Sequence, residues 1–276
     1  MPSPFDDPYL YDWEYRRRRA DVRFYRTLAD ERGGPILDIG CGTGRLMLPL
    51  LRDGHVVVGL DRAPAMLKRA AGRVQRLGLA GRRRAHLMRA DLRALPVGPR
   101  FAFAVAAFHT VQHCETNADL LRFFQGAAAA LLPGGWLAFD TFAPDQRFVD
   151  RRGRSGRTRF RDPRTGRPTI YTESHQIEPG HDGPILAMTF HYQALAKVSP
   201  GLARGRTRHL SLRHRLLQPT EIQSLLARAG LLLVATWGGF DGRPLVADDT
   251  QTEQHVYLAQ SPRASPRASQ RVSNKK

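Results

Sequence analysis

The stretch PILDIGCGTG, residues 35–44, decides the fold of this chain. Its first half is a short apolar run with one acid, Asp38, which is typical of a buried parallel strand. Its second half has glycine at alternate positions, where the missing Cβ atoms let the backbone turn tightly and approach a flat ligand. Leucines at helical spacing follow at positions 46, 50 and 51. A strand, a glycine loop and a helix in this order predict the nucleotide-binding corner of a doubly wound α/β sheet.

A second apolar run, HVVVGL at residues 55–60, ends at Asp61, 23 residues after Asp38. A carboxylate at the end of the second strand can accept hydrogen bonds from both ribose hydroxyls of an adenosine. The dinucleotide motif would need glycine at position 45, where this chain has Arg45. The G-x-G-x-G spacing therefore argues against a dinucleotide ligand. If the chain bound a dinucleotide nevertheless, it would be a Rossmann-like oxidoreductase, which is the alternative interpretation.

Five motifs follow one another in the order of a known family. They are DIGCGTG at 38–44, GLD at 59–61, RADLRALP at 89–96, FAFAVAAFHTVQH at 101–113 and LLPGGWLAFDTF at 131–142. Together they resemble the class I S-adenosylmethionine-dependent methyltransferases over residues 9–260. The resemblance implies an α/β fold with a doubly wound, seven-stranded, mostly parallel sheet, and S-adenosyl-L-methionine as the cofactor. A relative that binds this cofactor without catalysis is a further alternative.

The resemblance also implies which residues bind the cofactor. An N-terminal helix expected over residues 9–32 would bring Tyr11 and Arg17 to the methionine carboxylate. Asp91 would accept a hydrogen bond from the adenine amino group, and the Leu92 backbone would touch the ring. The full set of expected cofactor contacts is Tyr11, Arg17, Asp38, Gly40, Cys41, Gly42, Asp61, Arg62, Asp91, Leu92 and Phe108.

A long insertion separates the expected fifth strand from the helix at Pro219. Strand-like runs at 169–178, 185–193 and 210–216 predict an antiparallel sheet, and the arginine-rich segment 151–168 predicts a mobile loop. We therefore expect a cofactor-binding domain (1–142 and 218–260), an inserted β lid (143–217) and a disordered basic tail (261–276). An insertion at this point is similar to that of glycine N-methyltransferase-like and amino-sugar N-methyltransferase enzymes.

Methyl transfer from a sulfonium demands mainly that the nucleophile, the methyl group and the sulfur be aligned, sometimes with help from a base. His113 follows the expected fourth strand and titrates near neutral pH, which makes it the candidate base; its alternative role is to cap or pack against the next helix. His109, Asp140 and Tyr192 are the candidate substrate contacts. Although His109 and His113 are four residues apart, no third ligand follows at a suitable spacing, so we expect no metal.

The chain of 276 residues has a formal net charge of +18, and only four of its 43 basic residues are lysines. A GC-rich coding sequence would produce the same arginine bias, so we expect mostly solvated surface charge. The fourth-strand motif has neither the Pro-Cys nor the Asp/Asn-Pro-Pro-Tyr/Phe of DNA base methyltransferases. RNA stays an alternative through the arginine-rich insert and the tail. We therefore predict methyl transfer to an amine or hydroxyl of a small molecule.

Cys41 and Cys114 are the only cysteines and lie far apart, which suggests a reducing compartment such as the cytoplasm. The first residues lack the apolar run of a signal peptide, and no run approaches 18 apolar residues. We therefore expect a cytoplasmic protein with neither a leader nor a membrane span.

Overall fold

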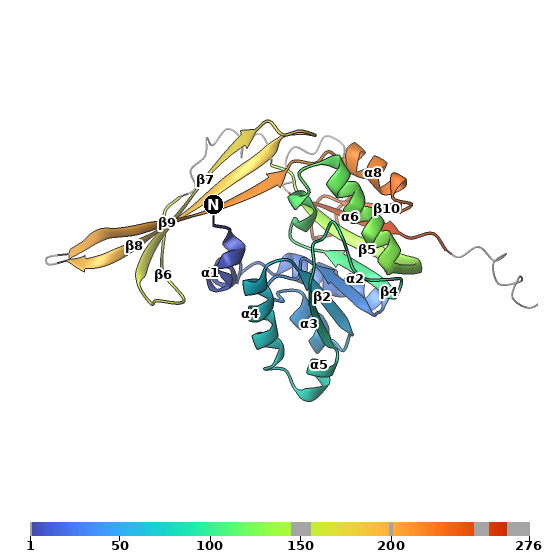
Figure 1. The fold of residues 1–276 in the computed structure, drawn as a ribbon, viewed down its shortest axis with the longest axis horizontal. Helices are drawn as coiled ribbons and strands as arrows, with labels where there is room; N and C mark the ends of the chain where they lie inside the picture. Colours follow the sequence, from blue (N-terminus) through green and yellow to red (C-terminus); the bar gives the residue numbers. More distant parts are fainter. Residues whose placement is uncertain (1, 145–155, 199–200, 246–253, 264–276) are drawn as a thin grey trace, which may run out of the picture.

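The computed structural model describes residues 2–144, 156–198, 201–245 and 254–263. Its central sheet has seven strands in the order β10-β11-β5-β4-β1-β2-β3 (Figure 1). Strands β1 to β5 run parallel, and β11 is antiparallel to both of its neighbours. The predicted doubly wound, mostly parallel sheet is confirmed. The strands are β1 (Ile36–Ile39), β2 (Val57–Asp61), β3 (Ala85–Arg89), β4 (Phe101–Ala106), β5 (Leu131–Phe142), β10 (Leu232–Trp237) and β11 (Gln254–Gln260).

Helices cover both faces of this sheet. The apolar side chains of α6 and α8 pack on one face, while those of α2, α3 and α4 pack on the other. Helix α6 begins at a capping residue, since the Thr116 hydroxyl accepts a hydrogen bond from the Asp119 amide at 3.1 Å. The helices are η1 (Pro4–Asp6), α1 (Pro8–Glu14), α2 (Ala20–Arg32), α3 (Met47–Arg52), α4 (Pro64–Val74), α5 (Leu79–Arg83), η2 (Thr110–His113), α6 (Asn117–Ala130) and α8 (Pro219–Arg228).

The N-terminal segment forms two helices, where the sequence predicted a single helix over residues 9–32. Helix α1 ends at Glu14 and α2 begins at Ala20. Arg16 to Arg19 lie in the break, and all four are exposed. Four successive guanidinium groups would crowd like charges onto one helical turn, which disfavours a continuous helix there. The break lets α1 leave the line of α2 and pack against the inserted sheet.

The insertion forms a four-stranded antiparallel sheet in the order β6-β7-β8-β9, which we call the lid. It projects as a long twisted arm from the end of the central sheet and passes over α1 (Figure 1). The expected loop at 151–168 is wrong in part, because β6 forms within it; residues 145–155 lie outside the described residues. The lid strands are β6 (Thr158–Arg161), β7 (Pro168–Glu178), β8 (Ile185–Val198) and β9 (Gly201–Arg215).

A small apolar cluster joins the lid to α1. Leu10 packs with Phe160, Phe190, Tyr192 and Leu210 of the lid, each less than a tenth exposed. The alternating apolar residues of β8 and β9 that predicted strands therefore form the face that covers the N-terminal helix. The tail beyond residue 263 lies outside the described residues. In the part of the chain that is described, no helix is long and apolar enough to cross a membrane.

Candidate active site

The glycine loop after β1 is fastened to the end of β2 through Asp61. One oxygen of the Asp61 carboxylate accepts a hydrogen bond from the Gly42 amide at 2.8 Å, and the other accepts from Ala63 at 2.8 Å. Gly40 has a φ of +74°, and a Cβ atom there would lie 2.7 Å from the Thr110 side chain. Only glycine allows this approach. The loop is therefore held in one shape at the carboxyl ends of β1, β2 and β4.

The shape and chemistry of this corner fit an adenosine. A Cβ atom on Gly42 would have only the Gly40 carbonyl oxygen within 4.0 Å, so a flat ligand can lie against the loop. Each oxygen of the half-buried Asp61 carboxylate has a lone pair left for a ribose hydroxyl. Asp38 is buried, and its Oδ2 atom has no hydrogen-bond partner among the described residues. Burial raises the pKa of Asp38 to about 7.

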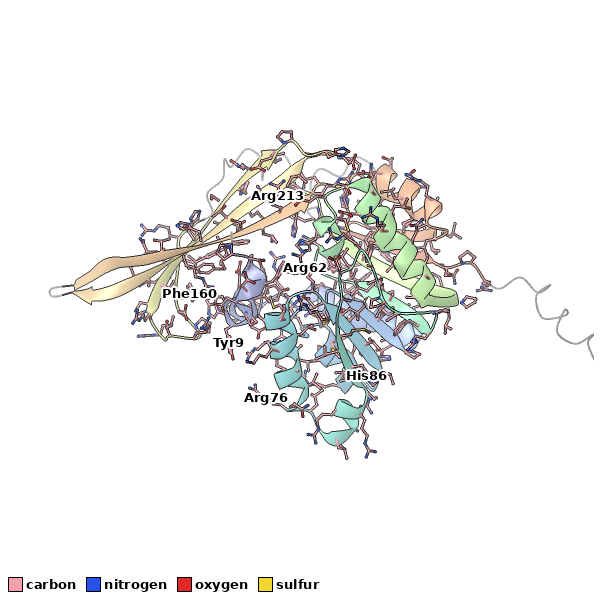
Figure 2. The ribbon with its side chains drawn as sticks, viewed as in Figure 1. Tyr9, Arg62, Arg76, His86, Phe160 and Arg213 are labelled. Atoms are coloured by element: carbon pink, nitrogen blue, oxygen red, sulfur yellow. The ribbon has the colours of Figure 1, made fainter. Side chains whose placement is uncertain are left out.

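The residues expected around the adenine lie beyond β2 and β3. Asp91 is held by Arg93 through two hydrogen bonds of 2.9 and 2.7 Å, which lower the pKa of the Asp91 carboxyl to about 2. A bond to an adenine amino group would use its remaining lone pairs. Leu92 is half-buried beside it. The Arg62 side chain is exposed on the lid side of the central sheet, and its carbonyl accepts a hydrogen bond from Arg89 at 3.3 Å (Figure 2).

Two of the remaining expected cofactor contacts lie at this corner and one does not. Tyr11 on α1 is half-buried, its ring centroid lies 6.4 Å from that of Phe108, and burial raises its pKa to about 12. Cys41 is a buried free thiol in the glycine loop. Arg17 is exposed in the break between α1 and α2, and none of the described residues forms a hydrogen bond or ion pair with it. A role for Arg17 would therefore need its side chain to turn inward.

Sequence reasoning missed Asp12, which ties α1 to the glycine loop. Its carboxylate accepts hydrogen bonds from the Thr43 hydroxyl at 2.6 Å and from Arg69 Nε at 2.8 Å. Arg73 completes the set by pairing with Asp12 at 3.2 Å and donating to the Thr43 carbonyl at 3.0 Å. The sequence offered one signal for this role: Asp12 is an acid that lies between aromatic residues in an arginine-rich N-terminal segment. Asp12 thus positions α1, and with it Tyr11, over the corner.

Asp140 has a role different from the expected substrate contact. Its side chain is fully buried and accepts hydrogen bonds from the Tyr25 hydroxyl (2.6 Å), the Phe108 amide (2.8 Å) and the His109 amide (3.0 Å). Phe108 and His109 have φ values of +61° and +60°, the left-handed region that non-glycine residues seldom occupy. Asp140 therefore holds a strained two-residue turn at the end of β4 and is itself out of reach of a substrate.

Three histidines meet beside this turn. His109 and His113 come from the β4–η2 segment, and His214 comes from β9 of the lid. The His214 ring centroid lies 4.8 Å from that of His113 and 5.8 Å from that of His109. Burial lowers the pKa of His113 to about 4 and lowers those of His109 and His214 as well. The described residues contain no group of three suitable ligands for a metal ion.

The remaining predicted substrate residue, Tyr192, lies at the interface between the lid and α1. It is 5% exposed, and its hydroxyl donates to the Glu14 carboxylate at 3.0 Å. Trp13 stacks on Phe160 close by, with ring centroids 3.8 Å apart. Tyr192 is therefore a packing residue of the lid in this structure. Glu14 was missed because its partners lie on a sheet more than 150 residues away.

Comparisons with known proteins define the class of this chain. Residues 36–135 match the model of a methyltransferase domain. The fold matches that of an S-adenosylmethionine-dependent methyltransferase from Clostridium acetobutylicum with a TM-score of 0.70, over 92% of this chain and 96% of the other, at 18% identity. The chain therefore carries a methyltransferase domain over residues 36–135 and has the fold of S-adenosylmethionine-dependent methyltransferases, as its motifs predicted. The predicted family, fold and cofactor are thereby confirmed.

Three further proteins are similar to this chain. An N,N-dimethyltransferase of Streptomyces fradiae that acts on dTDP-3-amino-3,6-dideoxy-α-D-glucopyranose is 26% identical over 84% of this chain and 83% of its own. The structure of DesVI from Streptomyces venezuelae matches with a TM-score of 0.68, over 91% of this chain and 96% of that one, at 22% identity. A ubiquinone biosynthesis O-methyltransferase of Methylobacterium is 37% identical over 48% of this chain. The chain spans 49% of that relative, about half of its length.

Proposed function

We propose that this protein transfers a methyl group from S-adenosylmethionine to an amine of a small molecule, with an amino sugar as the first class to test. The observation that carries the proposal is the position of the strained Phe108–His109 turn. It lies at the end of β4, beside the glycine loop and under β9 of the lid. The similarity to an amino-sugar N,N-dimethyltransferase over most of both chains supports an amine over a hydroxyl.

The cofactor, when bound, would supply an electrophilic methyl group carried by a sulfonium. Asp61 would hold the ribose, the glycine loop would lie against the nucleoside, and Asp12 would keep α1 over the amino-acid end. These residues would fix one direction of approach for the acceptor, which is the main contribution that such a site makes to the rate. The lid and α1 would keep water from the reacting groups.

His113 stays the candidate base. Burial keeps its imidazole neutral at pH 7, so a ring nitrogen can accept a hydrogen bond from the acceptor. A pKa of about 4 also means that His113 would not retain a proton at neutral pH. Its role would therefore be to orient the nucleophile and to pass the proton on to water.

The alternative of an RNA substrate has less support from the charges of the lid. Several lid arginines are paired with acids: Arg208 with Asp7 at 2.7 Å, and Arg213 with Glu115 at 3.1 Å and Glu178 at 2.7 Å. Paired guanidinium groups contribute less to phosphate binding than free ones do. These pairs reduce the unpaired positive charge that the lid offers to a nucleic acid.

One experiment separates the candidate functions. The protein would be incubated with S-adenosylmethionine labelled in its methyl group and, in parallel, with dTDP-3-amino-3,6-dideoxy-α-D-glucopyranose, with the matching 3-hydroxy sugar nucleotide and with mixed RNA. We expect label in the amino sugar alone. Label in RNA alone would overturn the proposal. Tight binding of S-adenosylhomocysteine without labelling of any amine or hydroxyl acceptor in a wider panel would favour a protein that binds the cofactor without catalysis.

A further inference from the structure

Six aromatic side chains form a closed circuit of ring contacts where β4 ends. They come from η1, α1, the β4–η2 turn, η2 and β9, so the N-terminus, the central domain and the lid all contribute. The successive centroid distances are Phe5–Tyr11 6.3 Å, Tyr11–Phe108 6.4 Å, Phe108–His109 5.0 Å, His109–His214 5.8 Å, His214–His113 4.8 Å and His113–Phe5 5.4 Å. We call this set the aromatic circuit.

The lid member of the circuit, His214, has unused hydrogen-bonding capacity. It is 5% exposed, and neither of its ring nitrogens has a hydrogen-bond partner among the described residues. His109, by contrast, is bonded through Nε2 to the Gln254 side chain at 2.8 Å. A neutral imidazole has one ring nitrogen that donates a hydrogen bond and one that accepts, so His214 can bind a polar group of a ligand. His214 is therefore the member of the circuit with both a protected position and an available hydrogen bond.

Backbone strain at the circuit points to a binding role. Phe108 and His109 both have positive φ values, and the buried Asp140 carboxylate holds both of their amides. Such conformations are strained and persist mainly where the surrounding structure enforces them, often at functional sites. The turn presents the rings of both residues to the circuit. The two rings are stacked, with an interplanar angle of 22°.

The charges around the circuit disfavour a cationic ligand. The Arg45 guanidinium lies over the Phe108 ring at 4.6 Å, and that of Arg18 lies over it at 5.5 Å. The Phe108 ring therefore already has two cations against it, which would repel an ammonium group. The nearby acids have partners: Asp21 binds Arg45, Asp140 binds Tyr25, and Asp61 binds two backbone amides.

We propose that the aromatic circuit binds the methyl acceptor, that it selects the acceptor nitrogen as a neutral amine, and that His214 of the lid is its hydrogen-bonding residue. This inference rests on the proposed function and specifies the acceptor site. A neutral amine has the lone pair that the displacement requires, whereas an ammonium ion has none. Selection of the neutral form also agrees with the burial of the three histidines, which lowers the pKa of each imidazole.

The test compares two probes of the same shape, choline and its uncharged isostere 3,3-dimethylbutan-1-ol. Both would be titrated at pH 7.5 into the full-length protein, with and without S-adenosylhomocysteine, and their affinities measured by ligand-observed NMR. We expect the neutral probe to bind about tenfold more tightly than choline. His214→Leu and His214→Phe should each weaken the neutral probe about fivefold, because both remove the ring nitrogens. Only the phenylalanine variant keeps the ring.

The matched control is His209→Leu, the same substitution on the opposite face of β9, where His209 is exposed. It should leave both affinities unchanged. Equal or tighter binding of choline, an unchanged affinity in both His214 variants, or no saturable binding of either probe would each overturn the proposal. S-adenosylhomocysteine binding, measured separately by calorimetry, tests the proposed function. A protein that binds S-adenosylhomocysteine but does not discriminate the probes would disprove the acceptor site alone.

Discussion

At the scale of single residues, Asp61 shows what a linear motif predicts well. Its carboxylate lies at the end of β2 and is fixed by two amides of nearby loops, an arrangement that the strand pattern and the glycine spacing determine together. Asp140 and His214 show what a linear motif cannot predict. Their roles depend on Tyr25, which is 115 residues from Asp140, and on a lid strand that crosses the end of β4. No local pattern indicates those partners.

Replacement of Asp61 should weaken cofactor binding. In Asp61→Ala, the ribose hydroxyls would lose their acceptor and the Gly42 amide would lose its partner. We expect S-adenosylhomocysteine affinity to fall by roughly 1–3 kcal/mol in isothermal titration calorimetry. The control is Asp53→Ala, which removes an acid paired with Arg26 away from the loop. An unchanged affinity in Asp61→Ala, or tighter binding of NAD than of S-adenosylhomocysteine, would contradict the assignment.

The buried histidines predict a loss of stability in acid. His113 has a pKa of about 4 in the folded protein and about 6.5 when unfolded, so the unfolded state gains a proton first as the pH falls. We would measure the free energy of unfolding with urea at pH 7.5 and at pH 5. Between these pH values it should fall by roughly 2 kcal/mol more in the wild-type protein than in His113→Phe. Buried carboxylates with raised pKa values, such as Asp38 and Asp140, act in the opposite direction but are common to both proteins. An identical pH dependence would show that His113 is not desolvated.

At the scale of elements, strands and helices with strong periodicity were predictable, while breaks and short strands were not. The apolar alternation of β8 and β9 and the cap of α6 follow from local chemistry. The break between α1 and α2 depends on competition between helix propensity and charge repulsion. Strand β6 depends on pairing with β7, which holds residues 158–161 in register with 168–171. An arginine-rich run alone does not indicate such a partner.

Arg215 anchors the base of the lid, and its replacement should destabilise the whole chain. Its side chain is fully buried and donates to Asn117 at 3.0 Å, to the Asp182 carbonyl and to Glu221. Arg215→Met would keep much of the volume but leave Glu221 and the Asp182 carbonyl without their donor. We expect urea unfolding to show a loss of about 3–5 kcal/mol. Arg213→Met, which breaks exposed ion pairs two residues earlier on β9, should cost less than about 1 kcal/mol. Equal losses would mean that Arg215 is not an anchor.

At the scale of the whole molecule, the net charge of +18 raises the question of what the basic residues do. Sequence alone leaves open a polyanionic partner. The structure pairs many arginines with the few acids, as in the contacts of Arg208 with Asp7 and of Arg69 with Asp12. The lid and α1 are joined through such pairs and through the Leu10 cluster. These pairs hold three parts of one chain together, but each pair is neutral, so the net charge of +18 comes from the basic residues in excess of the acids.

The basic C-terminal segment offers the clearest test of whether charge serves function. The structure sets the cut after Arg263, because the Ser261 amide donates to Gly135 at 2.8 Å and the Pro262 carbonyl accepts from Gly134 at 3.1 Å. Truncation there removes Arg267, Arg271, Lys275 and Lys276. We expect unchanged methyl transfer and unchanged S-adenosylhomocysteine affinity, since no described site residue lies beyond the cut. Binding to mixed RNA should weaken, because up to four phosphate contacts are lost. In a plot of the logarithm of the RNA-binding constant against the logarithm of salt concentration, the slope should decrease in magnitude by roughly 3. Cutting after Gln260 serves as the comparison, since it also removes the two backbone hydrogen bonds and should lower the unfolding temperature. Loss of turnover after the Arg263 cut, with RNA as the only labelled product, would show that the substrate is a nucleic acid.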